Sequence, residues 1–323
     1  MDIKVGHFGN TFLLSSIIAI CFTRPTIIYD FFENITYNYN GIYGVRILIQ
    51  GELNLILIDD KIPILCDNKK IPMTSYTKKE IWLPILEKAW AKANGKSYIK
   101  NLYGTPLEAF KTISFAPTIV HQHKKYNLRG RFDLIWKILL EASLKKYAIC
   151  VSTEHYENND LNEFPKEEEK ENSSIDNNSN INLHNENIKS VENQMIWNLN
   201  CNKFFSILDV YEFEEGKLIK AWTPKDEDIS EWNGLYSEDS DEWSKELKEY
   251  VGYKKTPGVI YLTFDEYVKI FSWTYICKIE DNYIYRSLKS KSFSPDSSEI
   301  EKENKLNNCN KNKEEEICKI FFL

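Results

Sequence analysis

Cysteine and histidine are the residues of this chain best suited to nucleophilic or metal chemistry. A cysteine thiolate activated by a histidine is a protein nucleophile, and closely spaced cysteine pairs bind zinc. The seven cysteines are an odd number, widely scattered, and include no CxxC pair: Cys21, Cys66, Cys150, Cys201, Cys277, Cys309 and Cys318. This pattern predicts reduced thiols in a cytoplasmic protein, with neither a disulfide framework nor a zinc site.

The positions of the histidines in the sequence do not identify a cysteine–histidine nucleophilic pair. Cys21 lies deep in an apolar run, which predicts a core residue. His121 and His123 form a His-x-His pattern in a polar stretch, which we interpret as a surface pair or an adventitious metal contact. The remaining three histidines are distant from one another in the sequence: His7, His155 and His184.

Composition and charge restrict the classes of function. The 323 residues are 42% hydrophobic and 14% aromatic, enough for a packed core. A net charge of −7 without a basic patch gives no support for nucleic-acid binding and favours solubility over attachment to anionic membranes. The apolar run at residues 12–22 is too short to span a bilayer. It is interpreted either as a core helix or as the apolar part of a secretory signal.

Two stretches have the composition of disordered chain. Residues 156–194 are rich in Asn, Glu and Asp, and cannot bury enough apolar surface to offset their ordering entropy. Residues 288–323 form a polar tail whose last four residues, Ile320–Leu323, are apolar enough to dock back weakly. The remaining blocks are 1–155, expected to be a helical lobe, and 195–287, expected to be a β-rich lobe.

The elements of the first block follow from capping and periodicity. Asn10 or Thr11 can cap a helix that carries the apolar run. Two β-rich stretches around Gly51 predict a hairpin. Thr77 and Glu80 fit a capping box, although Pro84 favours a helix start nearer Trp82. The apolar spacing in 132–144 predicts another helix, with Leu134, Ile138 and Ala142 or their neighbours on its buried face.

The second block is rich in strand signals. Residues 204–213 and 217–222 are separated by Glu215-Gly216, which predicts a hairpin. Residues 259–264 predict another strand, followed by a short helix over 266–271. A helical block followed by a β-rich block indicates the α+β class.

Several motifs along the chain form an ordered set. They are Val5-Gly6-His7-Phe8-Gly9-Asn10-Thr11-Phe12-Leu13-Leu14, Ile58-Asp59-Asp60-Lys61-Ile62-Pro63, Glu80-Ile81-Trp82-Leu83-Pro84 and Glu231-Trp232-Asn233-Gly234 with Ser237, Ser240 and Trp243. Further blocks are Gly41-Ile42-Tyr43-Gly44-Val45-Arg46, Asp209-Val210-Tyr211, Lys217-Leu218-Ile219 and Gly258 to Phe264. This ordered set resembles the calpain-like cysteine protease family and spans nearly all of residues 1–282 except the polar insertion. The resemblance implies a papain-like fold, with a helical lobe, a β-rich lobe and a cleft between them.

The resemblance also implies four site positions, and each holds another residue type. Thr11 falls on the nucleophilic cysteine, Lys203 on the histidine, Thr223 on the orienting asparagine and Val5 on the oxyanion glutamine. A threonine hydroxyl has a far higher pKa than a thiol, and threonine nucleophiles use their own terminal amine as base. We therefore expect Thr11 to be a helix cap and Lys203 an exposed lysine. A hydroxyl–lysine dyad of these two residues is the alternative.

Calcium is the family's usual activator, and the resemblance implies only part of a site for it. Glu231 and Glu238 fall on carboxylate ligands, but the partner loop reads Pro257-Gly258-Val259 where the family has acidic residues. A calcium site needs several oxygen ligands. The resemblance therefore implies a partial calcium site and no other cofactor.

Two functional hypotheses remain. In the first, the chain is a calpain-like pseudoprotease that acts as a peptide- or protein-binding scaffold, because strand-like pairing in a cleft needs no nucleophile. In the second, it is a calcium-dependent cysteine-type endopeptidase with residual or unconventional activity. We expect a protein or peptide partner, and neither nucleic acid nor membrane. The first motif starts within five residues of Met1, which is consistent with a part of a larger polypeptide or complex.

Overall fold

The computed structural model describes most of the chain up to residue 283. The described residues are 3–4, 6, 10–49, 51–64, 76–77, 80–95, 97–98, 104–127, 130–153, 195–196, 199–200, 203–214, 216–223, 232–280 and 283. The two stretches that we expect to be disordered, 156–194 and 288–323, lie outside these residues.

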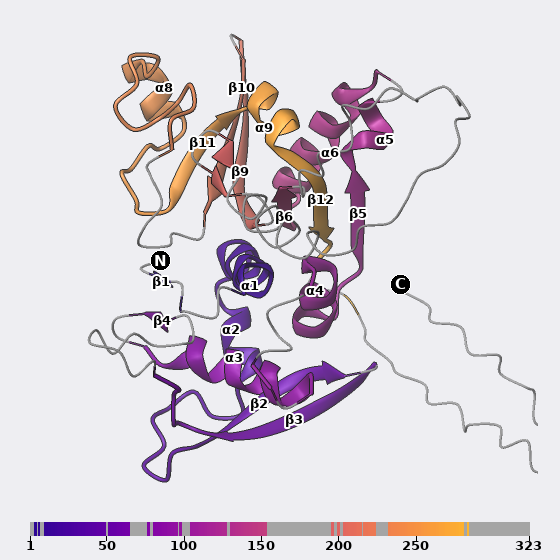
Figure 1. Cartoon of the computed structure of the whole chain (residues 1–323), viewed down its shortest axis with the longest axis vertical. Helices are drawn as coiled ribbons and strands as arrows, with labels where there is room; N and C mark the ends of the chain where they lie inside the picture. Colours follow the sequence, from indigo (N-terminus) through magenta and orange to yellow (C-terminus); the bar gives the residue numbers. More distant parts are fainter. Residues whose placement is uncertain are drawn as a thin grey trace, which may run out of the picture.

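The molecule has two lobes that meet at the first helix (Figure 1). The lower part of the view contains α2 (Ile27–Phe31), α3 (Trp82–Ala93) and the hairpin of β2 (Ile42–Ile49) and β3 (Glu52–Asp59), with the short pair β1 (Ile3–Lys4) and β4 (Tyr76–Thr77). Between the lobes lie α1 (Thr11–Thr23) and α4 (Pro106–Ser114).

The upper lobe is built on one antiparallel sheet of six strands in the order β11-β10-β9-β6-β12-β5. These strands are β5 (Thr118–Gln122), β6 (Ala148–Thr153), β9 (Phe204–Phe213), β10 (Gly216–Trp222), β11 (Val259–Thr263) and β12 (Phe271–Cys277). Beside it lie α5 (His123–Asn127), α6 (Phe132–Leu144), α8 (Lys245–Tyr250), α9 (Phe264–Ile270) and the pair β7 (Met195–Ile196) and β8 (Leu199–Asn200).

The sheet joins strands from both sides of the lobe boundary that we expected at residue 155. Strands β5 and β6 precede that position, yet β6 pairs with β9 and both β5 and β6 pair with β12. The lobe boundary in space therefore differs from the boundary suggested by composition. Local periodicity reports each segment's own pattern, whereas strand pairing depends on distant segments.

Helix α1 is a 13-residue helix that is buried along residues 11–21. Its hydroxyl groups are satisfied within the core, since Ser16 Oγ donates to the Phe12 carbonyl at 2.7 Å. Ser15 Oγ donates to the Phe204 carbonyl, and Ser206 Oγ donates to the Ser15 carbonyl, both at 2.7 Å. The apolar run thus forms a core helix with polar links to β9. Within the described residues, no helix is long and apolar enough to cross a membrane.

The two faces of the large sheet belong to different cores. Cys150, Tyr275 and Cys277 pack in a cluster with α1, α3 and α4. Ile149 and Ile276, whose side chains point to the opposite face, pack in a cluster with α6 and α9. This division follows from the two-residue alternation of side chains along a strand. Helix α1 therefore packs against one face of the sheet, and α6 and α9 against the other.

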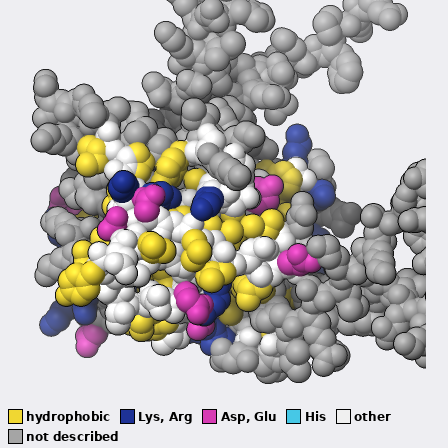
Figure 2. All heavy atoms as spheres, turned by 90° about the horizontal axis from the view of Figure 1, so that it is seen from below, with side chains coloured by type: hydrophobic (Ala, Val, Ile, Leu, Met, Phe, Trp, Pro, Cys, Tyr) yellow, Lys and Arg dark blue, Asp and Glu magenta, His cyan; other side chains and the backbone are white. Residues whose placement is uncertain are grey.

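The outer face of the β2–β3 hairpin carries exposed apolar side chains. Residues alternate along β3, with Ile58 buried and Leu53, Leu55 and Leu57 between 49% and 59% exposed. Figure 2 shows this side of the molecule from below, with hydrophobic side chains spread across its centre. Gly51 turns the chain between the strands with φ at +82°, a conformation that favours glycine.

The predicted hairpins and helices are confirmed in their main positions. The helix over residues 132–144 has the bounds of α6, with Ala142 buried as expected and the rest of the buried face one residue further on, at Ile135 and Leu139. Helix α3 begins at Trp82 and holds Pro84 in its first turn, so the capping box at Thr77 is wrong. The N-cap of α1 is Asn10, without a side-chain cap bond. The prediction that Thr11 caps this helix is also wrong.

Candidate functional site

Thr11 is the first residue of α1, at the junction of the two lobes. Its side chain is buried, with 4% of the residue exposed. The Oγ1 atom accepts a long hydrogen bond of 3.4 Å from the backbone N–H of Phe204. Phe12, the next residue, packs edge-to-face on Phe204 with ring centroids 6.3 Å apart. The hydroxyl is therefore in contact with the start of β9 in the upper lobe.

Lys203 immediately precedes β9, and its backbone is fixed to the end of β6. Its N–H donates to Thr153 Oγ1 at 3.1 Å, and its carbonyl accepts from the Thr153 N–H at 3.2 Å. The Thr153 hydroxyl also lies 3.3 Å from this carbonyl. These bonds place the Lys203 backbone one residue from the contact between Phe204 and Thr11.

Thr223 immediately follows β10, at the same end of the sheet. Trp222 pairs with Ser206 across β10 and β9, so the start of β9 and the end of β10 are neighbours. The Thr223 N–H donates to the Gly258 carbonyl at 2.7 Å. Gly258 has φ at +79°, and an added Cβ would lie 3.0 Å from the Thr223 carbonyl oxygen. Glycine at this position lets the loop before β11 approach the end of β10.

These three positions therefore come from the start of α1, the start of β9 and the end of β10, which meet at the lobe junction. Val5, the fourth position implied by the resemblance, lies outside the described residues. The roles that the resemblance assigns to all four residues stay predictions.

The chemistry available at this junction is limited by the Thr11 hydroxyl. The N-terminus of a helix carries about half a positive charge and stabilises a nearby anion by about 1 kcal/mol. One pKa unit corresponds to about 1.4 kcal/mol, so the helix lowers a hydroxyl pKa by less than about one unit. That change is far too small to form an alkoxide near neutral pH.

The described cysteines are all in the core. Cys21, Cys150 and Cys277 are free and buried, and burial raises the pKa of the Cys21 and Cys277 thiols to about 12. Burial also raises the pKa of Cys150 well above its usual value. The prediction that Cys21 is a core residue is confirmed, and a thiol with a raised pKa is a poor nucleophile.

The His-x-His pair is not a surface pair. His121, on β5, is half-buried and lies 2.8 Å from the Tyr126 hydroxyl. His123 is only 3% exposed, and its Nε2 lies 2.7 Å from Thr274 Oγ1. The expectation of a surface location is therefore wrong for His123, because α9 and β12 cover it. Among the described residues, no group of three or more His, Cys, Asp or Glu side chains is arranged to hold a metal.

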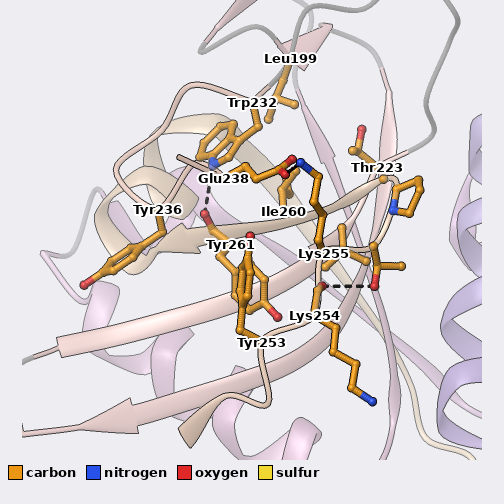
Figure 3. Close-up of a pocket in the computed structure, with 14 residues that line it drawn as sticks. Leu199, Thr223, Trp232, Tyr236, Glu238, Tyr253, Lys254, Lys255, Ile260 and Tyr261 are labelled. Atoms are coloured by element: carbon orange, nitrogen blue, oxygen red, sulfur yellow. Dashed lines mark hydrogen bonds and ion pairs between the residues drawn. The ribbon is translucent and has the colours of Figure 1, made fainter. Parts of the chain in front are cut away.

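Glu238, one of the two implied calcium ligands, forms an ion pair with Lys255. The other, Glu231, lies outside the described residues. The two residues of the ion pair come from different loops, Glu238 between Trp232 and α8, and Lys255 before β11. Figure 3 shows Lys255 extending toward Glu238, while Lys254 points in the opposite direction.

A pocket of about 200 Å³ lies between these loops and reaches Thr223 (Figure 3). Aromatic side chains form much of its lining: Trp232, Tyr236, Tyr253 and Tyr261. The Trp232 indole donates to the Tyr261 carbonyl at 3.1 Å. An added Cβ on Gly234 would lie 1.9 Å from the Trp232 ring, so this position admits only glycine in the present packing. Trp232 and Gly234 of the Glu-Trp-x-Gly motif therefore have a packing role beside the pocket.

Two features of this region were missed by reasoning from the sequence. Thr153 fixes the backbone of Lys203, and Lys255 pairs with Glu238. Both interactions join segments that are separated in the chain, and neither partner is part of a recognisable local motif. An acidic loop and a Lys-Lys pair near an expected strand were the available signals, but they do not specify which charges meet.

Comparison with known proteins agrees with the fold. A sequence model of the family described as "Calpain family cysteine protease" matches residues 1–278. Similar proteins include "Calpain-type cysteine protease ADL1" of Oryza sativa subsp. japonica, 25% identical over 284 residues that make up 86% of this chain and 11% of that protein. Another is "Calpain-1 catalytic subunit" of Rattus norvegicus, 24% identical over 287 residues that make up 86% of this chain and 35% of that protein. The chain thus spans about a third or less of the length of these relatives.

Proposed function

Because this chain belongs to the calpain family of cysteine proteases, with the papain-like fold of its protease core, we propose that it binds a peptide or protein partner without cleaving it. In this proposal Thr11, Lys203, Thr223 and Val5 stand where active family members have cysteine, histidine, asparagine and glutamine. Proteolysis is lost and the two-lobed scaffold is retained.

The observation that carries the proposal is the position of the Thr11 hydroxyl. It lies at the first residue of α1, is buried, and already accepts the Phe204 N–H. The hydroxyl pKa is far above the value of about 8.5 for a free thiol. Without a strong base to remove its proton, the hydroxyl does not attack a peptide carbonyl at a useful rate.

Two surfaces support partner binding: the aromatic-lined pocket that reaches Thr223 and the outer face of the β2–β3 hairpin. Rigid aromatic rings such as those beside Thr223 provide contact area at a low cost in conformational entropy. The outer face of the hairpin exposes Leu53, Leu55 and Leu57 together, and contiguous apolar patches of this kind mark interaction sites in many soluble proteins. An extended peptide can bind a cleft through main-chain hydrogen bonds, which require no nucleophile.

A cytoplasmic location is part of the proposal and is supported by cysteine usage. The three described cysteines are free and lie in the core, which suits a reducing compartment. Fractionation of cells that express the chain tests the location, and recovery in the secreted fraction would contradict it.

The experiment that tests the loss of proteolysis compares cleavage of casein and of a mixed quenched-fluorescent peptide pool, with calcium and with a chelator. We expect no turnover above the buffer rate in either condition. A peptide selected from a displayed library should instead bind and protect the backbone near Lys203 and Thr223 from hydrogen exchange. Turnover that disappears in both Thr11→Ala and Lys203→Ala would establish the hydroxyl–lysine protease instead.

Restoring the family's residues tests the positions themselves. The combined variant Val5→Gln, Thr11→Cys, Lys203→His and Thr223→Asn should gain labelling by a thiol-directed active-site probe. The matched control carries Thr23→Cys in place of Thr11→Cys, because Thr23 is at the other end of the same helix. Equal labelling of both variants would mean that the start of α1 gives the thiol no special reactivity.

A further inference from the structure

The ion pair between Glu238 and Lys255 bears on the calcium dependence that the family suggests. Of the two residues expected to supply calcium-binding carboxylates, Glu238 is the one that the structure describes. Its carboxylate is already paired with the Lys255 ammonium. A calcium ion at this carboxylate would compete directly with that ammonium for the same oxygen atoms.

The other loop does not supply the missing oxygen ligands. Pro257, Gly258 and Val259 have no side-chain oxygen, and the Gly258 carbonyl accepts the Thr223 N–H at 2.7 Å. The Thr256 carbonyl likewise accepts the Val259 N–H at 3.0 Å. Within the part of the chain that the structure describes, no cluster of acidic, His or Cys side chains is arranged around a metal position. The residues that the structure describes around Glu238 therefore do not fit a calcium ion there.

We propose that Lys255 is a built-in cation, whose ammonium supplies between these two loops the positive charge that a bound calcium ion would otherwise supply. The chain then organises this side of the β-rich lobe without a metal. The ion pair crosses from the loop after Trp232 to the loop before β11, which are the two segments that a shared cation would join.

Aromatic packing holds the same loops by a means that does not depend on ions. Trp243 contacts Tyr236, Tyr253 and Tyr261, with ring centroids 4.8 to 5.0 Å apart. Its indole donates to the Ser237 carbonyl at 2.9 Å, next to Glu238. Trp243 is 7% exposed and forms a small core with Tyr261 and Leu218 of the sheet. This core sets the distance between the loops, and the ion pair neutralises the charge at their rim.

The loop that carries Lys255 is connected to the candidate site by the hydrogen bond between the Thr223 N–H and the Gly258 carbonyl. The loop that carries Lys255 continues to Gly258, which is bonded to the backbone of Thr223. A metal-independent loop therefore fixes the end of β10 at the lobe junction. It follows that neither calcium nor a chelator should change the position of the end of β10 at the lobe junction.

Reversing the charge of Lys255 provides the sharpest test. Terbium ion serves as a luminescent substitute for calcium, because Trp232 in the same pocket can sensitise its emission. The unsubstituted chain should give no saturable terbium signal that calcium displaces, and equal melting temperatures in calcium and in chelator. Lys255→Asp places a second carboxylate beside Glu238 and should gain a calcium-displaceable terbium signal. Lys254→Asp is the matched control, since Lys254 lines the same pocket but points away from Glu238.

Two terbium results would overturn the inference. One is a calcium-displaceable terbium signal in the unsubstituted chain that Glu238→Gln removes. The other is a terbium signal in Lys255→Asp no larger than in Lys254→Asp, which would mean that the ammonium does not stand at a cation position. None of these readouts depends on whether the chain binds or cleaves peptides.

A neutral variant covers the case in which charge reversal prevents folding. Lys255 is 76% exposed on its side chain, and exposed ion pairs are weak. Lys255→Met should therefore fold and increase protease cleavage in the loops around residues 238 and 255 by about two- to fivefold over Lys254→Met. Equal cleavage rates in the two variants would also count against the proposed role.

Discussion

Single residues decide the chemistry at the lobe junction. Thr11 occupies the start of α1, and its hydroxyl is buried and accepts the Phe204 N–H. In the proposed function it replaces the family's cysteine nucleophile. Lys255 occupies a position where one positive charge suffices to pair with Glu238. In both cases one side chain changes what the fold can do, because helix ends and loops present reactive groups while the core only positions them.

His123 provides a prediction at the same scale. It lies between β12, whose Thr274 hydroxyl it meets, and α9, whose Tyr267 ring is 5.4 Å away by centroid. Burial lowers the pKa of His123 to about 4, against a backbone hydrogen bond with Phe271 that raises it, and repulsion from His121 of β5 lowers it further. The unfolded chain has a histidine pKa near 6.5, so it binds more protons than the folded protein below that pH.

The stability contributed by neutral His123 is therefore fully present above about pH 6.5 and decreases as the pH falls toward about 4. At pH 5 the loss is about 2 kcal/mol relative to pH 8. Urea denaturation at the two pH values measures it, and His123→Gln should remove most of the difference. A His123→Gln variant with the same pH dependence as the unsubstituted chain would show that other groups cause the loss.

At the scale of elements, the hairpin of β2 and β3 shows how alternation separates core from surface. Its inner face contributes Tyr43, Val45 and Ile47 to the core that contains α1 and α3. Its outer face exposes leucines instead of the polar residues that alternation usually places there. The strand signal in the sequence is therefore strong, but it does not reveal which of two apolar faces is buried.

Substitutions at two neighbouring residues of β3 test which face of the hairpin is buried. Ile58 is 6% exposed and Leu57 is 54% exposed. Ile58→Thr should lower the free energy of unfolding by about 2–3 kcal/mol, because it buries a hydroxyl and removes apolar contact. Leu57→Thr should change it by less than about 0.5 kcal/mol, since threonine suits an exposed strand position. Denaturant unfolding measures both values, and equal losses would mean that the outer face is covered in solution.

At the scale of the whole molecule, α1 connects the two lobes. Its side chains lie in one cluster with α3 and the hairpin below and with Trp222, Cys150 and Tyr275 of the sheet above. The serine bonds to β9 add polar contacts that a displaced helix would leave unsatisfied. The lobes are therefore expected to depend on the same helix for their stability.

A core substitution in α1 should destabilise both lobes together. Ile17 has no exposed surface, and Ile17→Ala should cost about 2–5 kcal/mol through lost contact and the cavity left behind. Phe22 is 43% exposed near the end of the same helix, and Phe22→Ala should cost less than about 1 kcal/mol. Circular dichroism and tryptophan fluorescence should report one shifted transition for Ile17→Ala. Two separate transitions would show that the lobes unfold independently.

The sequence by itself determined the local elements and the family. Hairpin turns, the helix over residues 132–144 and the motif order depend on neighbouring residues, and so they can be recognised without a structure. The six-stranded sheet was beyond this reasoning, because β5 and β6 both pair with β12, more than a hundred residues further along the chain. The polar pattern of β5 also concealed both that strand and the burial of His123.

The candidate site, too, was predicted only in part from the sequence. Thr11, Lys203 and Thr223 were named from motifs, but only the tertiary structure shows the backbone contacts that bring their elements to one junction. The pairing of Glu238 with Lys255 was likewise decided by the fold. Residue identity sets which chemistry is available, whereas the distance between groups from separate segments is set by packing of the whole chain.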